Sequence, residues 1–197
     1  PDIGTCPDGE HRMSRRPVAP YIAGAVGVVL IAFLGVLALA KPGGSESASS
    51  PLLGEPAPIV RSSTIDGPEF DLARRKGSWV VLNFFNSTCV PCRQEHEFLV
   101  DFDKEQKASE NPVELYTVVN DDSDSAINAF FSTFGGDWPK IRDDDGAISV
   151  AFGVAKVPES WVIDPNGFVR LRILGALTDG FLTTRLDELK KEFSGQA

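Results

Sequence analysis

Residue types that build metal sites and disulfide frameworks are scarce in this chain. It has three cysteines in 197 residues, too few for the disulfide network that holds many small secreted proteins together. A structural zinc site usually needs four ligands. Beyond Cys89 and Cys92, the part of the chain after residue 50 offers only His96 as a further Cys or His ligand. The sequence therefore predicts no metal and no cofactor.

An excess of positive charge is also missing. The formal net charge is -9, with 19 Lys and Arg against 28 Asp and Glu. Nucleic-acid-binding domains carry basic surfaces that neutralise phosphates, so this balance argues against nucleic acid as a partner. The composition of 42% hydrophobic and 24% charged residues is typical of a folded domain and excludes a disordered protein.

One segment, residues 21–40, is hydrophobic and free of charged residues. Twenty such residues are about the length that crosses a bilayer as a helix. Three arginines lie just before the segment and only Lys41 just after it, so the positive-inside rule predicts a cytoplasmic N-terminus. The alternative is a cleaved signal peptide, because Ala38 and Ala40 have the small-x-small form of a cleavage site. We expect an uncleaved, single-pass signal anchor in the cell membrane.

Composition divides the chain into four segments. Residues 1–20 are expected to be a short cytoplasmic segment, in which residues 1–12 precede Met13 and are interpreted as upstream or expression-derived. The transmembrane segment follows. Residues 41–55 are rich in Gly, Ser and Pro, which is typical of a flexible linker. Residues 56–197 form the folded domain, on the extracytoplasmic side.

The folded domain alternates between strand-like and helix-like patterns. Trp79–Phe85 is short, apolar and rich in branched and aromatic residues, which predicts a central strand buried on both faces. Just beyond it, Glu95, Leu99 and Phe102 share one face of an amphipathic helix. The other expected elements are a hairpin of residues 59–65 and 69–72, a strand over 113–119, helices over 124–134 and 147–152, a hairpin of residues 161–164 and 168–174, and a closing helix over 182–193. This order predicts an α/β thioredoxin-like fold, a mixed sheet flanked by helices, with an extra N-terminal β-hairpin.

Cys89 and Cys92 stand between the predicted central strand and the helix. Cys89 then lies at the helix N-terminus, where free N–H groups and the helix dipole stabilise a thiolate. The Cys-x-x-Cys spacing lets the second thiol reach back and resolve a mixed disulfide. We therefore predict a redox-active disulfide in which Cys89 attacks and Cys92 resolves.

Two other activities on the same fold are disfavoured. A copper chaperone would want a histidine near the far end of the sheet, and none follows His96. A peroxidase of the peroxiredoxin kind would need a proline and a threonine upstream of the attacking cysteine, where Leu82 and Asn86 stand instead. Dithiol–disulfide exchange remains.

Three stretches of sequence carry a resemblance to a known family. They are GEPAP at residues 54–58, VVLNFFNSTCVPCRQE at residues 80–95, and FGVAKVPESWVIDPNGF at residues 152–168. In their order and spacing they resemble the TlpA/ResA/CcmG family of membrane-tethered thioredoxin-like proteins, over residues 54–193. The resemblance implies a thiol-disulfide oxidoreductase.

The resemblance also implies roles for particular residues. Val157-Pro158 corresponds to the proline, normally cis, that faces the active-site cysteines and shapes the peptide-binding groove. Glu95 corresponds to a family glutamate associated with the reactivity of the pair, which suggests that it relays the proton of Cys92. The alternative is an acid that merely complements the helix dipole. Glu159 matches a glutamate of the cytochrome c maturation members, although it can also be interpreted as an ordinary exposed acid.

The chain departs from the family pattern at the rim of the site. Relatives usually have Trp before the first cysteine, whereas this chain has Thr88. We expect Thr88 and Pro91 to line the substrate groove together with Val157 and Glu159. A smaller, more polar rim leaves the choice of partner and the reduction potential open.

The leading functional hypothesis is a reductant of disulfides in exported proteins, such as apocytochrome c during cytochrome c maturation. A membrane thiol electron donor would keep it reduced. The alternatives are a disulfide oxidase for secreted proteins and a redox-inactive module that holds peptides in the proline groove. An intact cysteine pair disfavours the last.

Overall fold

The computed structural model describes residues 19–39 and 45–195. They belong to two compact units, residues 1–42 and 43–197, which are described separately. The predictions for residues 1–18 lie outside the described residues, as does the role of Lys41.

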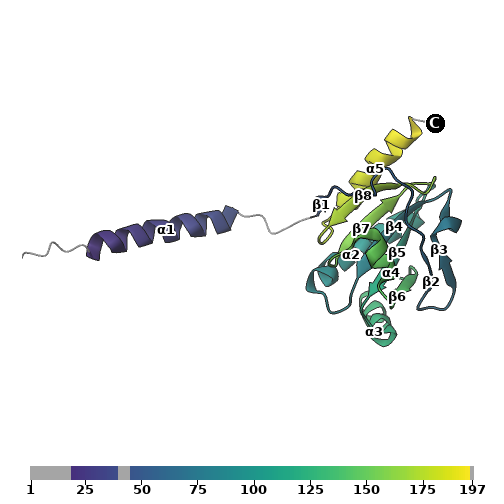
Figure 1. Cartoon of the computed structure of the whole chain (residues 1–197), viewed down its shortest axis with the longest axis horizontal. Coiled ribbons are helices and arrows are strands. Elements are labelled where there is room, and N and C mark those ends of the chain that lie inside the picture. The colour runs from purple at the N-terminus through teal and green to yellow at the C-terminus, as the bar shows by residue number, and fades with distance from the viewer. Residues whose placement is uncertain (1–18, 40–44, 196–197) are drawn as a thin grey trace, which may run out of the picture. The chain divides into compact units, whose positions relative to one another are not determined.

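The first unit contains α1 (Ala19–Leu39), a helix of 21 residues that covers nearly the whole hydrophobic segment (Figure 1). The side chains described in α1 run from residue 22 to residue 36. Most of its large apolar side chains in that range are exposed, among them Val28 and Ile31. Within the described residues, no helix combines the length and the apolar character needed to cross a membrane.

The second unit is built on a mixed six-stranded sheet in the order β1-β8-β7-β4-β5-β6, with β2 and β3 paired separately. The strands are β1 (Glu46–Ser47), β2 (Arg61–Ser63), β3 (Glu69–Asp71), β4 (Trp79–Phe85), β5 (Val113–Asn120), β6 (Lys140–Asp143), β7 (Glu159–Ile163) and β8 (Val169–Leu174). The helices are α2 (Val90–Lys107), α3 (Asp124–Phe134), α4 (Ala147–Phe152) and α5 (Phe181–Ser194), with a 3-10 turn η1 (Leu72–Arg75).

Strand β4 is the centre of the sheet, and all seven of its residues are buried. It pairs in parallel with β5, which pairs in parallel with β6. On its other side it pairs antiparallel with β7, and β7 with β8. This arrangement confirms the predicted thioredoxin-like fold, and the antiparallel β2–β3 pair confirms the extra hairpin.

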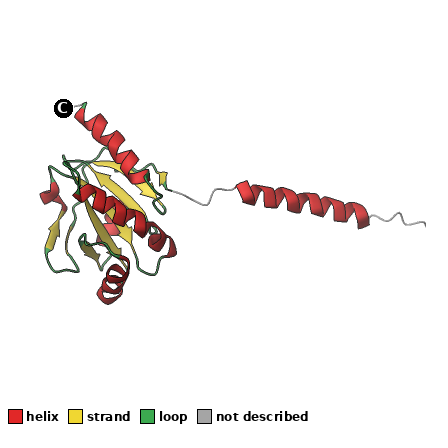
Figure 2. Ribbon diagram, turned by 180° about the vertical axis from the view of Figure 1, so that it is seen from behind, coloured by secondary structure: helices red, strands yellow, loops and turns green. Residues whose placement is uncertain are grey.

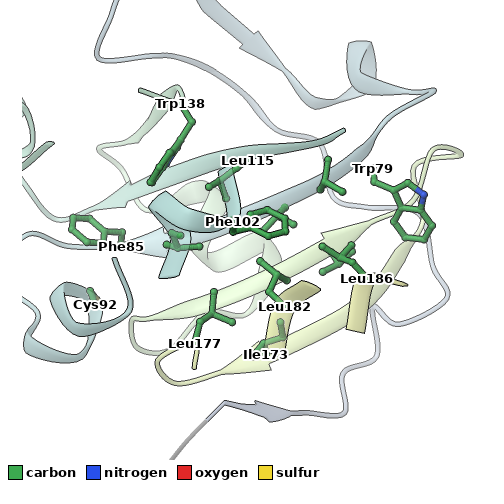
Figure 3. Packing of buried hydrophobic residues seen from close by; sticks show 14 of the residues in the cluster. Trp79, Phe85, Cys92, Phe102, Leu115, Trp138, Ile173, Leu177, Leu182 and Leu186 are labelled. Atoms are coloured by element: carbon green, nitrogen blue, oxygen red, sulfur yellow. The ribbon is translucent and has the colours of Figure 1, made fainter. Parts of the chain in front are cut away.

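Successive residues of β4 point to opposite faces of the sheet, so the strand contributes to two cores. Val81 and Phe85 pack with residues of α2, α3 and α5. Leu82 and Phe84 pack on the other face with α4 and the β2–β3 hairpin (Figures 1 and 2). Figure 3 shows the first cluster from close by, with Phe85 and Cys92 at one end and Trp79 at the other.

The predicted flexible linker, residues 41–55, is wrong for residues 45–55, the part that the structure describes. Residues 46–47 form β1, which pairs antiparallel with β8. The hydroxyl of Ser45 donates to the carbonyl oxygen of Ala176, and the backbone N–H of Gly54 donates to the carbonyl oxygen of Val169. The Gly, Ser and Pro composition does not predict this strand. Pairing at a sheet edge needs only backbone groups, which every residue except proline supplies in full.

Strand β6 was not predicted. Its sequence, Lys140-Ile-Arg-Asp143, contains one apolar residue, yet three of the four side chains are buried. Lys140 Nζ lies 3.0 Å from a carboxylate oxygen of Asp66, in the hairpin turn. A strand whose charged side chains are neutralised by a distant segment gives no hydrophobic pattern to detect.

Candidate active site

The cysteine pair lies directly at the start of α2. Cys89 is its N-cap residue, and the two sulfurs form a disulfide. The backbone N–H of Cys92 donates to Cys89 Sγ, with a nitrogen–sulfur distance of 3.2 Å. Cys89 is half-buried whereas Cys92 has no exposed surface. Cys89 Sγ is therefore the accessible sulfur of the pair and Cys92 Sγ the shielded one.

The loop from β4 to α2 is held by the last residue of β5 and the two residues that follow it. The Asn86 side-chain amide donates to the carbonyl oxygens of Asn120 and Asp121, at 2.9 and 2.8 Å. The backbone N–H of Ser87 donates to a carboxylate oxygen of Asp122. Thr88 is exposed and tied back to Asn86 Oδ1 through its own N–H. The loop is therefore positioned by polar contacts that the sequence analysis did not single out.

The peptide bond between Val157 and Pro158 is cis, as the family resemblance implied. The carbonyl oxygen of Val157 lies 3.7 Å from Cys89 Sγ. Pro158 is buried, whereas Val157 is half-buried and Pro91 and Val90 are exposed. The cysteines and the proline segment, 68 residues apart in sequence, thus meet at one place, with Thr88 and Pro91 at its exposed rim.

Glu95 lies in the core, one helical turn after Cys92, and has no exposed surface. One carboxylate oxygen accepts from the Asn83 amide at 2.8 Å and the other from the Leu177 backbone N–H at 2.7 Å. Burial raises the pKa of Glu95 to about 7, although both hydrogen bonds lower it. A carboxyl group that titrates near neutral pH can take up and release a proton under working conditions.

Glu159 is not at an exposed groove. It is 1% exposed and pairs through both carboxylate oxygens with Arg172 of β8, at 2.8 and 3.2 Å. Glu159 is the register partner of Phe84, so it lies on the sheet face opposite Glu95. The predicted placement of Glu159 in the substrate groove is therefore wrong, because its carboxylate is buried in the ion pair with Arg172.

His96 is buried in the core. It lies among aromatic rings, including those of Phe130, Phe131 and Trp138, at centroid distances of 4.7 to 5.6 Å. Its Nε2 is 2.9 Å from the carbonyl oxygen of Gly135. Burial lowers the pKa of His96, so the neutral form is favoured.

Residues 52–188 match the Redoxin family. The chain belongs to this family. Among curated relatives, the thiol:disulfide interchange protein HelX of Rhodobacter capsulatus is 31% identical, over 70% of this chain and 77% of the relative. Thiol-disulfide oxidoreductase ResA of Bacillus subtilis is 28% identical, over 86% of this chain and 93% of the relative. The relatives are thiol-disulfide oxidoreductases of the TlpA/ResA/CcmG type, as the sequence motifs implied.

Solved structures agree on the fold of this redoxin. MTB dsbF superposes with a TM-score of 0.60 at 24% identity, covering 66% of this chain and 94% of that one. A thioredoxin family thiol:disulfide interchange protein from Chlorobium tepidum superposes with a TM-score of 0.56 at 27% identity, covering 66% and 91%. Both support a thioredoxin-like fold for this chain.

Two functional candidates escaped the sequence analysis. Asn83 sits inside the apolar run of β4 yet bonds Glu95, and Arg172 fixes Glu159. A polar residue in the middle of a strand expected to be buried on both faces is the signal that could have singled out Asn83. Arg172 alternates with apolar residues along β8 and looks like an ordinary outward residue.

Proposed function

We propose that this redoxin is an extracytoplasmic reductant of protein disulfides, with apocytochrome c as the leading substrate. The observation that carries the proposal is the arrangement of the pair: half-buried Cys89 caps α2, and fully buried Cys92 lies behind it, one turn before Glu95. An attacking sulfur needs access, and a resolving sulfur needs protection from competing disulfides.

The exchange proceeds in two steps. In the reduced protein, the Cys89 thiolate attacks one sulfur of the substrate disulfide, forming a mixed disulfide and releasing the other substrate sulfur as a thiolate that takes up a proton. Cys92 then loses its proton and attacks Cys89 Sγ. This forms the Cys89–Cys92 disulfide and releases the second substrate sulfur as a thiolate, which takes up a proton. Two electrons pass from the redoxin to the substrate, and a thiol donor must return two to begin another cycle.

Glu95 serves the second step in this scheme. It is the buried carboxylate on the helical face of Cys92, and with a pKa of about 7 it can accept the proton that Cys92 must lose. Taking that proton inside the core avoids the need for water to enter. The substrate would lie against Val157, Pro91 and Thr88, which surround Cys89 on the exposed side.

We place the folded domain outside the cytoplasm, tethered by residues 21–40 as a signal anchor. The uncharged hydrophobic segment and the preceding arginines support this placement. Anchoring would keep the redoxin close to a membrane thiol donor. Carbonate extraction of membranes followed by protease protection tests it: a domain that stays in the pellet and is cleaved only from the outer side is expected.

Trapping the partner tests the substrate. Cys92→Ser should leave a Cys89 mixed disulfide that cannot be resolved, while the double variant that also has Cys89→Ser should trap nothing. Deleting the gene should abolish c-type cytochromes, and added external thiol should restore them. Intact cytochromes together with under-oxidised secreted proteins would establish the oxidase alternative instead. Absence of any mixed disulfide would favour the redox-inactive peptide-binding module.

A further inference from the structure

Asn83 is a fully buried amide at the centre of β4. It faces the same core as Val81 and Phe85, where every other residue that β4 contributes is apolar. Its Nδ2 donates to Glu95 Oε1 at 2.8 Å and to Ser160 Oγ at 3.0 Å. Its Oδ1 is buried and has no hydrogen-bond partner among the described residues. Burying an unpaired carbonyl oxygen costs free energy, so a contact made by the same amide must offset it.

Glu95 is the acceptor in both of its hydrogen bonds. Asn83 Nδ2 donates to one carboxylate oxygen and the Leu177 N–H to the other. This set suits an ionised carboxylate, which only accepts, whereas a protonated carboxyl group also needs an acceptor for its own O–H. The Asn83 amide therefore presents its N–H group to Glu95 and leaves its own Oδ1 unpaired.

No charged group within the described residues pairs with Glu95. On its own helix, Cys92 is one turn away, and His96 points to the Gly135 carbonyl oxygen. From β7, Ser160 reaches the Asn83 amide, while the neighbouring Glu159 lies on the opposite sheet face with Arg172. Burial disfavours the ionised form of Glu95, and two N–H donors, one from the backbone and one from a side chain, oppose this effect.

We propose that Asn83 is a positioning residue for the proton relay: its amide fixes the Glu95 carboxylate beside the cysteine pair and favours its ionised form. The proposal rests on the proposed function, in which Glu95 takes the proton of Cys92. The Leu177 N–H is a backbone group that every residue except proline supplies, so Asn83 is the side chain through which the fold sets the pH at which Glu95 titrates.

The test is to measure the titration of Glu95 itself in the full chain in detergent micelles, by carbon NMR of its labelled carboxyl group. Asn83→Leu keeps the size and removes the donor, and should raise the midpoint by about one to two pH units, as expected for a lost hydrogen bond to a charged group. Ser160→Ala is the matched control: it removes the other partner of the same amide and should leave the midpoint within about half a unit. An unchanged midpoint in Asn83→Leu, or an equal shift in Ser160→Ala, would overturn the proposal.

A measurement on the unmodified protein guards against a variant that fails to fold. The two Nδ2 protons of Asn83 should change chemical shift with the same midpoint as the Glu95 carboxyl carbon, and shifts independent of pH would contradict the proposal. Glu95→Gln separates the two hypotheses. If disulfide exchange by Glu95→Gln has the same pH dependence as the unmodified protein, the relay fails, while the NMR midpoints still decide the role of Asn83.

Discussion

Cys89 and Cys92 differ in their exposure and in their contacts. Cys89 Sγ accepts the N–H of Cys92 at the first turn of α2 and is half-buried, whereas Cys92 has no exposed surface. The reduced protein should therefore react with iodoacetamide at Cys89 first, and the rate should rise with pH as the thiolate forms. Mass spectrometry of peptides after brief labelling measures the order. Labelling of Cys92 ahead of Cys89 would reverse the assigned roles.

Glu95 gives a second prediction, on the pH dependence of stability. Its pKa rises from 4.5 in an ordinary setting to about 7 in the folded protein. The folded state therefore holds this proton more tightly than the unfolded state, and the free energy of unfolding falls as pH increases from 4.5 through 7. His96 acts in the opposite sense: burial lowers its pKa, so stability is lost as pH falls below 6.5.

Comparison with Glu95→Gln isolates the first effect, because His96 is common to both proteins. Between pH 4.5 and pH 8, the free energy of unfolding should fall by roughly 3 kcal/mol more in the unmodified protein than in Glu95→Gln. This difference is the free-energy equivalent of the change in the pKa of Glu95. Guanidinium unfolding of the oxidised proteins at several pH values measures it. A difference that does not change with pH would show that Glu95 is not held in its acid form by burial.

At the scale of elements, Arg172 joins β8 to its neighbours. Its guanidinium pairs with buried Glu159 of β7, reaches the carbonyl oxygens of Ser49 and Gly153, and lies 5.2 Å from the Trp161 ring. Arg172→Met should lower the free energy of unfolding by about 3–5 kcal/mol, because it leaves a buried carboxylate without a partner.

Two controls make the prediction about this ion pair specific. The double variant with Glu159→Gln should recover most of the loss, since no charge then remains buried. Arg61→Met removes an arginine whose side chain is 70% exposed where it pairs with Asp71, and should cost less than about 1 kcal/mol. An Arg172→Met effect as small as that of Arg61→Met would mean that Glu159 is satisfied by other groups.

Elements with a strong apolar pattern could be predicted from the sequence, and elements held by polar contacts could not. Trp79–Phe85 was recognised because all of its residues are buried, and α2 because its buried residues fall on one face. Strand β6 went unrecognised because Lys140 is buried against Asp66. The pairing of β1 with β8 went unrecognised because it depends on backbone groups alone.

The same distinction holds within the site. Cys89, Cys92 and the cis Pro158 follow motifs that are local in sequence, and the structure brings them together. The contacts of Asn83 and the sheet face on which Glu159 lies depend instead on which residues are opposite one another on neighbouring strands. The register of β4 against β7, with Asn83 opposite Ser160, decides both.

At the scale of the whole molecule, the folded domain contains every residue of the proposed exchange site. The pair, the proline segment and Glu95 all come from residues 45–195, so the proposed exchange chemistry belongs to this domain and the hydrophobic segment would supply only its location. Direction of electron flow is a property of the domain as well, since it depends on how well the dithiol is stabilised relative to the disulfide. Thr88 is exposed next to Cys89, and we expect its small polar side chain to bear on that balance.

The reduction potential of Cys89–Cys92 tests the central claim most directly. The full chain is equilibrated in buffers of defined dithiothreitol and glutathione ratio, and the reduced fraction is counted by thiol alkylation and mass spectrometry. We predict one reversible two-electron transition at about -200 mV or below, in the range of pairs that donate electrons. A value near -120 mV, that of strong oxidants, would contradict the reductant and assign the redoxin to disulfide formation.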